Sequence, residues 1–296
     1  YEDRTNKVFV TLDGRDNDVE ADEHDNVLPD VEVILGGFGG DDLYGNVGDN
    51  TVEGGTGEDL IDGKRRPDRL LGGDASDLVM ARDGLRDEVA CGDGGDLVIA
   101  DDKDEVIECE TVDRPGSRGV VVGRYARLSP RREVGLRLPQ GRRFFPVAQT
   151  VKIPIGSTID PPEGGVVRLT TASDREGGRK LVSASGGPFT VRQRGGRRAV
   201  TGLWLSGRLP DCRNREQQTA RRARPPRKLR ISEKGKGRVE VYGRYSIGGS
   251  FGTSWITEDR CDGTLTTVRS GTVRVRDLGR GRMVLVRPGH PYLAKR

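Results

Sequence analysis

The sequence predicts an all-β protein in which a parallel β-roll is followed by a second β-sandwich or barrel-like domain. Two observations predict this fold: a glycine- and aspartate-rich repeat of nine residues in the first half, and short alternating apolar segments between glycine and proline in the second. Charge separates the halves, because residues 1–114 carry 33 Asp and Glu against 11 Lys and Arg, whereas residues 115–296 carry 13 against 39. We therefore place an acidic module at 1–114, a linker at 115–130 and a basic all-β domain at 131–296.

The composition argues for a folded chain without a transmembrane segment. The 296 residues are 33% hydrophobic, and apolar runs such as residues 97–100 reach only four residues, whereas a membrane-spanning helix needs about eighteen. The sequence begins at Tyr1 without a basic and apolar leader, so we expect a processed or excised piece. The excess of acidic groups in the first module would cause repulsion in a compact state, which indicates bound cations.

The repeat follows the pattern G-G-x-G-x-D-x-U-x, in which U is apolar. Five contiguous units of nine begin at residue 36, and the pattern is complete in GGFGGDDLY at 36–44 and GGTGEDLID at 54–62. A ten-residue unit at 81–90 precedes CGDGGDLVI at 91–99. Glycine permits turns with positive φ, and the short D-x-U-x segment forms a strand whose apolar residue points inward. The inward residues are predicted to be Leu43, Val52, Ile61, Leu70, Val79 and Val98.

Two units of nine make one coil, so residues 18 positions apart stack on one another. Asp41, Asp59 and Asp77 have this spacing, as do Asn50 and Asp68. Carboxylates and turn carbonyls of successive coils then surround one gap, which is the oxygen-only ligand set that Ca²⁺ prefers, whereas Mg²⁺ resists dehydration. The candidate metal-ligating side chains are Asp41, Asn50, Asp59, Asp68, Asp77, Asp87 and Asp96. The alternative is a flexible Gly/Asp linker, but a linker would not need an apolar residue two places after each Asp.

Residues 36–99, continuing to about residue 110, resemble the RTX, or haemolysin-type, calcium-binding repeats. The resemblance implies a parallel β-roll with Ca²⁺ between adjacent turns. It implies carbonyl ligands at Gly37, Gly39, Gly55 and Gly57, with carboxylates from Asp41, Asp59 and Asp77. Lys64 to Pro67 replace one glycine turn, so we expect fewer ions than repeats, about two to four. Residues 91–113 resemble the segment that closes such arrays in bacterial secreted proteins.

Four cysteines provide a geometric test of the roll. Cys91 and Cys109 are 18 residues apart, which is one coil. Stacked strands lie about 4.8 Å apart, inside the range of about 4.4–6.8 Å between Cα atoms that a disulfide requires. The register predicts a Cys91–Cys109 bond, and Cys212 and Cys261 then pair by elimination. The alternative is four free thiols in a reducing cytosol; disulfides with a calcium motif instead indicate an extracellular or bacterial cell-surface location.

The basic half resembles the FecR-type β domain in residues 153–172 and 252–294. This resemblance implies signalling or interactions at the cell envelope, and it brings no catalytic residues. The loop at 213–238 is rich in Lys and Arg, which is typical of contact with an anionic wall or envelope polymer or of a solvated insertion, and we favour the insertion. The loop lacks aromatic residues for base stacking, which argues against nucleic acid.

The sequence does not favour an enzyme. Residues 248–252 match G-x-S-x-G, but β alternation follows them where a hydrolase requires a helix, and the chain has two His. We expect a calcium-binding structural or adhesive protein, secreted or displayed on the cell surface, whose folding is driven by extracellular Ca²⁺. The alternatives are the C-terminal export or stability tail of a secreted enzyme with its catalytic domain upstream, and an envelope sensor acting through the FecR-like domain.

Overall fold

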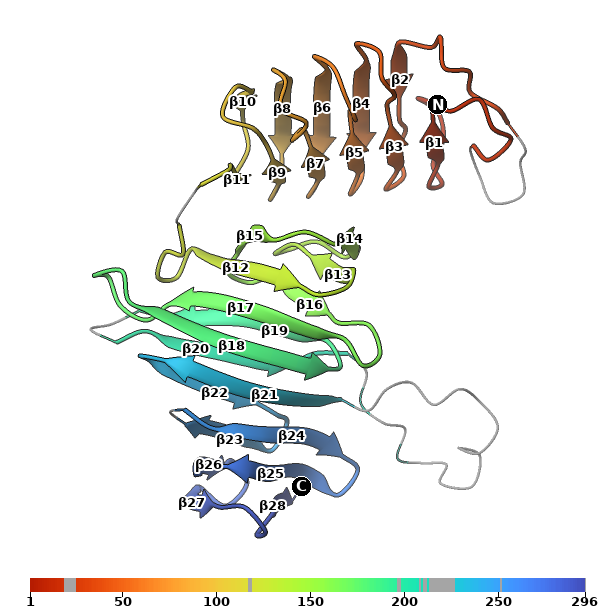
Figure 1. Ribbon diagram of the computed structural model, residues 1–296. Coiled ribbons are helices and arrows are strands. Elements are labelled where there is room, and N and C mark those ends of the chain that lie inside the picture. The colour runs from red at the N-terminus through yellow and green to blue at the C-terminus, as the bar shows by residue number, and fades with distance from the viewer. Residues whose placement is uncertain are drawn as a thin grey trace. The chain divides into compact units, whose positions relative to one another are not determined.

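The computed structural model describes residues 1–18, 25–116, 119–195, 198–207, 209, 212, 227–250 and 252–295, and these residues form strands, turns and irregular segments (Figure 1). The fold is all-β, as predicted. The chain divides into two compact units, one of Tyr1–Arg118 with Arg137–Phe145 and one of Gly119–Leu136 with Pro146–Arg296. No helix in the described part of the chain could cross a membrane.

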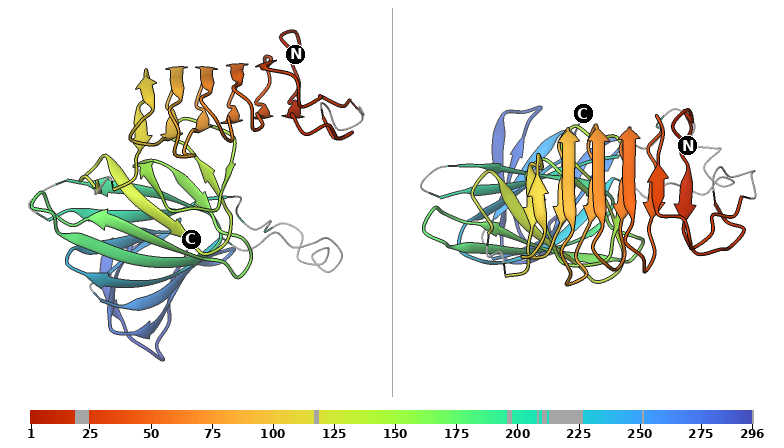
Figure 2. Two further views of the ribbon diagram at one scale, coloured as in Figure 1. Left: turned by 45° about the horizontal axis from the view of Figure 1, so that its top comes forward. Right: turned by 90° about the horizontal axis from the view of Figure 1, so that it is seen from above.

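The first unit contains a parallel β-solenoid of about four turns, here called the roll. One of its sheets has six strands in the order β1-β3-β5-β7-β9-β11, with bounds Phe9–Thr11, Asp42–Tyr44, Leu60–Asp62, Leu78–Met80, Leu97–Ile99 and Thr111–Asp113. The other has five in the order β10-β8-β6-β4-β2, with bounds Glu105–Ile107, Glu88–Asp93, Arg69–Asp74, Thr51–Thr56 and Val33–Leu35. Figure 2 shows the strands of the roll running side by side.

The register of the roll follows the repeat. Leu60 pairs with Leu78, and Thr51 with Arg69, each 18 residues further along the chain. The six predicted inward residues are each 0% exposed and belong to one apolar cluster. The structure therefore confirms the parallel roll and excludes the flexible linker for this segment.

The roll is longer at its beginning than the repeat alone indicates. Strand β1, which precedes the first nonad, pairs in parallel with β3, and Val8 and Val10 extend the apolar cluster. The ten-residue unit at 81–90 does not break the register, since Arg69 pairs with Glu88, 19 residues away. The additional residue is absorbed in the turn between β7 and β8, where Gly84 has a φ of +94°.

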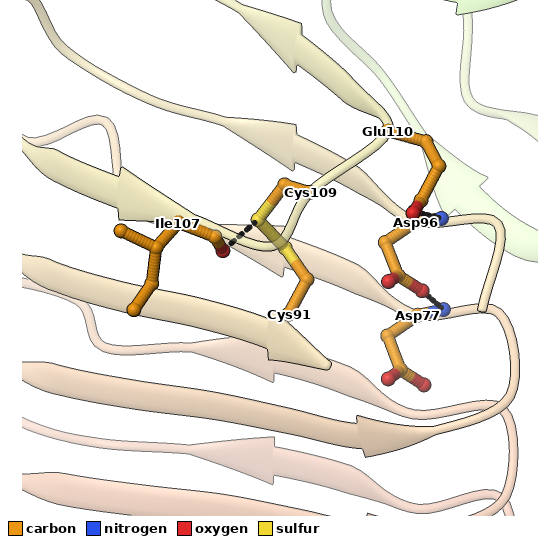
Figure 3. The surroundings of a disulfide bond; sticks show 6 residues. All are labelled: Asp77, Cys91, Asp96, Ile107, Cys109 and Glu110. Carbon is orange, nitrogen blue, oxygen red and sulfur yellow. Dashed lines mark hydrogen bonds between the residues drawn. A yellow bond between two sulfur atoms is a disulfide. The ribbon is translucent and has the colours of Figure 1, made fainter. Parts of the chain in front are cut away.

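Both predicted disulfides are present. Cys91 lies in β8 and bonds to Cys109 across one coil, with 5.1 Å between their Cα atoms (Figure 3). The bond lies at the last turns of the roll, before β11. Cys212 bonds to Cys261, with 5.5 Å between Cα atoms.

The second unit is built mainly from two large sheets. The eight-stranded sheet has the order β15-β12-β17-β18-β21-β24-β25-β28, with bounds Val151–Pro154, Tyr125–Pro130, Val166–Ala172, Arg179–Gly186, Lys228–Gly235, Ser254–Arg260, Gly263–Ser270 and Tyr292–Lys295. The nine-stranded sheet has the order β14-β13-β16-β19-β20-β22-β23-β26-β27, with bounds Phe145–Val147, Val134–Arg137, Thr158–Asp160, Phe189–Arg194, Val200–Leu205, Arg238–Tyr242, Ser246–Ser250, Val273–Asp277 and Arg282–Val286. All pairs in the eight-stranded sheet are antiparallel, whereas β20 and β22 pair in parallel.

Alternation along these strands buries one face of each sheet. In β18 and β21 buried and exposed residues follow one another, and Trp255 and Phe189 are each fully buried. This pattern is the one expected of antiparallel sheets with one solvated face. Residues 228–235 of the predicted basic loop instead form β21, inside the eight-stranded sheet, so the loop prediction is wrong for this part. Residues 213–226 lie outside the described residues, so the predicted role of that part stays a prediction.

Candidate metal centre

The Asp or Asn position of each repeat directly precedes a strand of the roll. Because strands alternate between the two sheets, these positions form two rows along the roll. The first acidic row precedes strands of the six-stranded sheet and consists of Asp41, Asp59, Asp77 and Asp96. The second acidic row precedes strands of the five-stranded sheet and consists of Asn50, Asp68, Asp87 and Asp104. All eight side chains are buried.

Each side chain in the first acidic row bonds to the backbone of the preceding coil. The Oδ1 atom of Asp59 accepts the N–H of Asp41 at 2.6 Å, and that of Asp77 accepts the N–H of Asp59 at 2.8 Å. Asp96 continues the series on Asp77 at 2.8 Å, and Glu110 ends it by accepting the N–H of Asp96 at 3.0 Å (Figure 3). One carboxylate oxygen per coil thus satisfies a buried backbone donor, which fixes the turns to one another.

The first glycine of the repeat makes room for this carboxylate. A Cβ atom added to Gly54 would lie 2.4 Å from Oδ2 of Asp59, and one added to Gly72 would lie 2.7 Å from Oδ2 of Asp77. The second glycine has a positive φ, +101° at Gly55, where a Cβ would lie 2.4 Å from the carbonyl oxygen of Gly37. The spacing from glycine to aspartate is therefore a steric requirement of the turn, whether or not a cation is bound.

The other oxygen of the first acidic row has no partner from the protein. Among the described residues of the roll, the buried carboxylate oxygens without a hydrogen-bond partner are Oδ2 of Asp59, Asp77 and Asp96. Burial, opposed in part by the backbone hydrogen bonds, raises the pKa of Asp59 and Asp96 to about 7 and that of Asp77 to about 9. Neighbouring carboxylates of the row add to the increase for Asp77. A buried oxygen of this kind is costly unless a proton or a cation compensates it.

The second acidic row has the same ladder. Oδ1 of Asp68 accepts the N–H of Asn50 at 2.8 Å, and Oδ1 of Asp87 accepts the N–H of Asp68 at 2.9 Å. Asp104 ends the row by accepting the N–H groups of Asp87 and Asp101. Burial raises the pKa of Asp68 to about 7 and that of Asp87 to about 6. Asn50 begins this row with a neutral side chain, whose Oδ1 accepts the N–H of Asn46 in its own turn at 2.9 Å.

A guanidinium lies at the beginning of the first acidic row. Nη1 of Arg143, which belongs to the same compact unit as the roll, donates to the carbonyl oxygens of Asp41 at 2.8 Å and Glu58 at 2.6 Å. Burial raises the pKa of Asp41, while Arg143 and Lys7 oppose that increase. Oδ2 of Asp41 also accepts the N–H of Gly37 at 2.9 Å. Asp41 therefore has a cation and a second donor from the chain itself, unlike the three following members of its row.

The predicted carbonyl ligands lie in the turns of the same row. The carbonyl oxygen of Gly37 accepts the N–H of Thr56 at 2.9 Å. A Cβ added to Gly57 would lie 2.1 Å from the carbonyl oxygen of Gly39, so this oxygen is directed at the next coil. Within the described ranges, no group of three or more His, Cys, Asp or Glu side chains is placed to hold a metal ion. A bound cation would therefore need turn carbonyls in addition to carboxylates.

The donors of the first acidic row fit a hard cation in their chemistry. They are all oxygen atoms, and the free Oδ2 atoms recur once per coil in the turn that the repeat makes from glycine. The repeat pattern predicted the positions of these side chains. It did not indicate Glu110, Asp104 or Arg143. Asp104 lies in the degenerate unit at 100–108, Glu110 follows that unit, and Arg143 lies outside the repeats. The only sequence signal for such a contact was the excess of Asp and Glu in the first module, which indicates that positive charge is needed there but not which residue supplies it.

No family model, curated protein or solved structure matches this chain.

Proposed function

We propose that the roll binds Ca²⁺ along the first acidic row, at Asp59, Asp77 and Asp96, and that the protein is a calcium-stabilised structural β protein of the RTX type. The observation that carries the proposal is the row of three buried Oδ2 atoms without a partner, one per coil. The ladder uses only Oδ1, so Oδ2 is free to bind a cation without loss of the turn structure.

The aspartates and the glycines of the repeat have different roles in the proposed site. Oδ1 of each Asp holds the preceding coil by its backbone N–H, while glycine keeps the turn open for Oδ2. Bound Ca²⁺ would supply positive charge that the row lacks, and Asp59 and Asp77 would bind it as carboxylates after losing their protons. Since the rows exist only when the coils stack, binding stabilises the folded roll by about 2.7 kcal/mol per site at a hundredfold excess over Kd.

The two disulfides favour an oxidising compartment, and we propose an extracellular or bacterial cell-surface location in which the roll serves as a spacer or adhesive scaffold. The FecR-like relationship of the second unit, and with it a role in envelope signalling, also stays a proposal. It is supported by an all-β unit in which strands β24 to β27 lie within residues 252–294, one of the two segments that carry the resemblance.

Calcium titration of the full chain tests the proposal. We expect saturable binding with Kd values of about 10⁻⁵–10⁻³ M by calorimetry, and increased protection of β5, β7 and β9 from hydrogen exchange. The D59N/D77N double variant keeps an Oδ1 acceptor for both ladder bonds but loses two free carboxylate oxygens, so its calcium response should be strongly reduced.

The matched control is D68N/D87N, which removes the same charge from the second acidic row. This control should keep most of the calcium response. Equal loss in both double variants would show that calcium is attracted by net charge and would reject a site in the first row. Absence of binding by the parent up to about 10 mM calcium would reject the proposal altogether.

A further inference from the structure

The outer face of the nine-stranded sheet carries a cluster of arginines, here called the cationic face. Its residues are Arg192, Arg194, Arg238, Arg274 and Arg276. In β26, Val273 and Val275 are buried whereas Arg274 and Arg276 between and after them are exposed. In β19, Val191 is buried and its neighbour Arg192 is exposed in the same way.

Strand pairing brings these arginines onto shared rows across the sheet. Arg192 pairs with Gly202, Gly202 with Glu240, Glu240 with Gly249, and Gly249 with Arg274. The next row runs through Trp204 and Tyr242 to Ile247, Arg276 and Met283. The face therefore extends over β19, β20, β22, β23, β26 and β27, with arginines at both of its sides.

Aromatic stacking orders the arginine at one side of the face. The rings of Trp204 and Tyr242 are stacked with centroids 3.7 Å apart and an angle of 8° between their planes. The guanidinium carbon of Arg192 lies 5.2 Å from the Trp204 ring, which is a cation–π geometry. Stacking of this kind fixes the guanidinium plane while its N–H groups stay available, because Arg192 is exposed.

The face has more positive charge than its own carboxylate can neutralise. Glu240 is buried, and its two oxygens are already paired with Arg194 at 3.0 Å and Arg238 at 3.2 Å. Within the described part of the chain, Arg192, Arg274 and Arg276 have no ion-pair partner. Three exposed guanidinium groups are thus left for an external anion, with an exposed aliphatic side chain, Leu285, beside Arg274.

We propose that the cationic face binds an anionic polysaccharide through its carboxylate or sulfate groups. The charge requires a polyanion, and guanidinium groups bind oxyanions in a bidentate manner. Single-stranded nucleic acid fits less well, because the Trp204 ring is already stacked on Tyr242 and has Arg192 in cation–π contact, so it is not a free platform for bases. Met283 and Leu285, 56% and 58% exposed, offer apolar contact to the C–H faces of sugar rings next to the arginines.

The experiment measures binding of the full chain to polygalacturonate, with neutral dextran as the uncharged polymer. The triple variant R192Q/R274Q/R276Q removes the three unpaired charges and leaves the Glu240 pairs intact. Each exposed ion pair contributes modestly, so the three together should weaken binding about tenfold. The double variant R274Q/R276Q, which does not touch the Trp204 stack, should show an intermediate loss.

The matched control places the same charge change on the outer face of the other sheet. The variant R168Q/R230Q/K234Q alters three exposed residues of β17 and β21 and should change binding about twofold at most. Equal losses in the two triple variants would show attraction by net charge alone and would overturn the proposal, as would the absence of binding by the parent. Tighter binding to single-stranded DNA or to anionic lipid vesicles than to polygalacturonate would also overturn it. Measurement in calcium and in chelator keeps this result independent of the roll, because the difference between the triple variants should persist in both.

Discussion

The two units bury carboxylates in different ways. In the second unit, Oε2 of Glu233 lies 2.6 Å from Nζ of Lys180, and Oδ2 of Asp259 lies 3.3 Å from Nε of Arg227. Ser250 also donates its hydroxyl to Glu233 at 2.6 Å. In the roll, Asp59, Asp77 and Asp96 receive backbone hydrogen bonds on one oxygen and have no partner on the other.

This difference follows from where each unit finds its positive charge. The second unit is rich in Lys and Arg, and Lys180 of β18 and Arg227 directly before β21 supply the cations for these two buried acids. The roll has three acidic residues for each basic one, and its repeat places an acid, not a pair, at each turn. A buried ion pair is complete within the chain, whereas a buried carboxylate row is complete only with protons or with an added cation.

Among the substitutions, the largest effect on stability is expected from removing one partner of the buried Lys180–Glu233 ion pair. Glu233→Gln leaves Lys180 buried, at 1% exposure of its side chain, without a negative partner. We expect a loss of about 3–5 kcal/mol in the free energy of unfolding of the second unit, independent of calcium. Tryptophan fluorescence measures this, because both Trp residues, Trp204 and Trp255, lie in that unit. A shift of similar size in Lys180→Met/Glu233→Leu, which removes both charges, would contradict the explanation by an unpaired charge.

A smaller effect is expected from the disulfide that closes the end of the roll. Replacing Cys91 and Cys109 by serine opens an 18-residue loop and should cost about 3 kcal/mol of roll stability. Hydrogen exchange of β8 to β11 should accelerate while the fluorescence transition of the second unit stays in place. Unchanged exchange in these strands would show that the bond does not hold the last coils.

The repeat spacing was sufficient to predict the roll, its inward residues and the Cys91–Cys109 bond, because each depends on the one number that sets the coil length. The register survived the ten-residue unit at 81–90, since a turn can absorb one residue without disturbing the strands that flank it. The position of Arg143 was not predictable in this way, because its contact with Asp41 depends on chain folding over about a hundred residues. The cationic face was also not predictable, because β19 and β26 share one surface only through the strand order of the nine-stranded sheet.

The raised pKa values in the first acidic row predict that the metal-free roll loses stability as the pH rises. Bound calcium should oppose this loss. Burial raises the pKa of Asp59 and Asp96 from 3.8 to about 7 and that of Asp77 to about 9. Because the folded-state pKa lies above the unfolded value, the protonated roll is fully stabilised below about pH 4 and loses stability as the pH rises through 7 to 9. At about 1.4 kcal/mol per pH unit between the unfolded and folded pKa values, Asp59 and Asp96 should each cost the metal-free roll about 3 kcal/mol from pH 5 to pH 8.

Calcium binds the carboxylate form, so its contribution should increase over the same pH interval. The measurement is chemical denaturation followed by far-ultraviolet circular dichroism, in chelator and in calcium. A metal-free roll that becomes more stable from pH 5 to pH 8 would contradict the burial of these groups.

The smallest effect is expected where charge is removed and the ladder is kept, in the absence of metal. In Asp77→Asn, the amide oxygen can accept the N–H of Asp59 as Oδ1 of Asp77 does, and Asn50 shows that an amide already occupies this repeat position in the second row. The substitution removes the free energy that folding spends at neutral pH on keeping Asp77 protonated, while the new N–H₂ group replaces Oδ2. These contributions oppose one another, so in chelator at neutral pH the stability should change by less than about 1 kcal/mol, and Asp68→Asn should behave alike. A loss of several kcal/mol in Asp77→Asn alone would mean that its second oxygen already has a structural role in the metal-free roll, and the contrast with the ion pairs of the second unit would then fail.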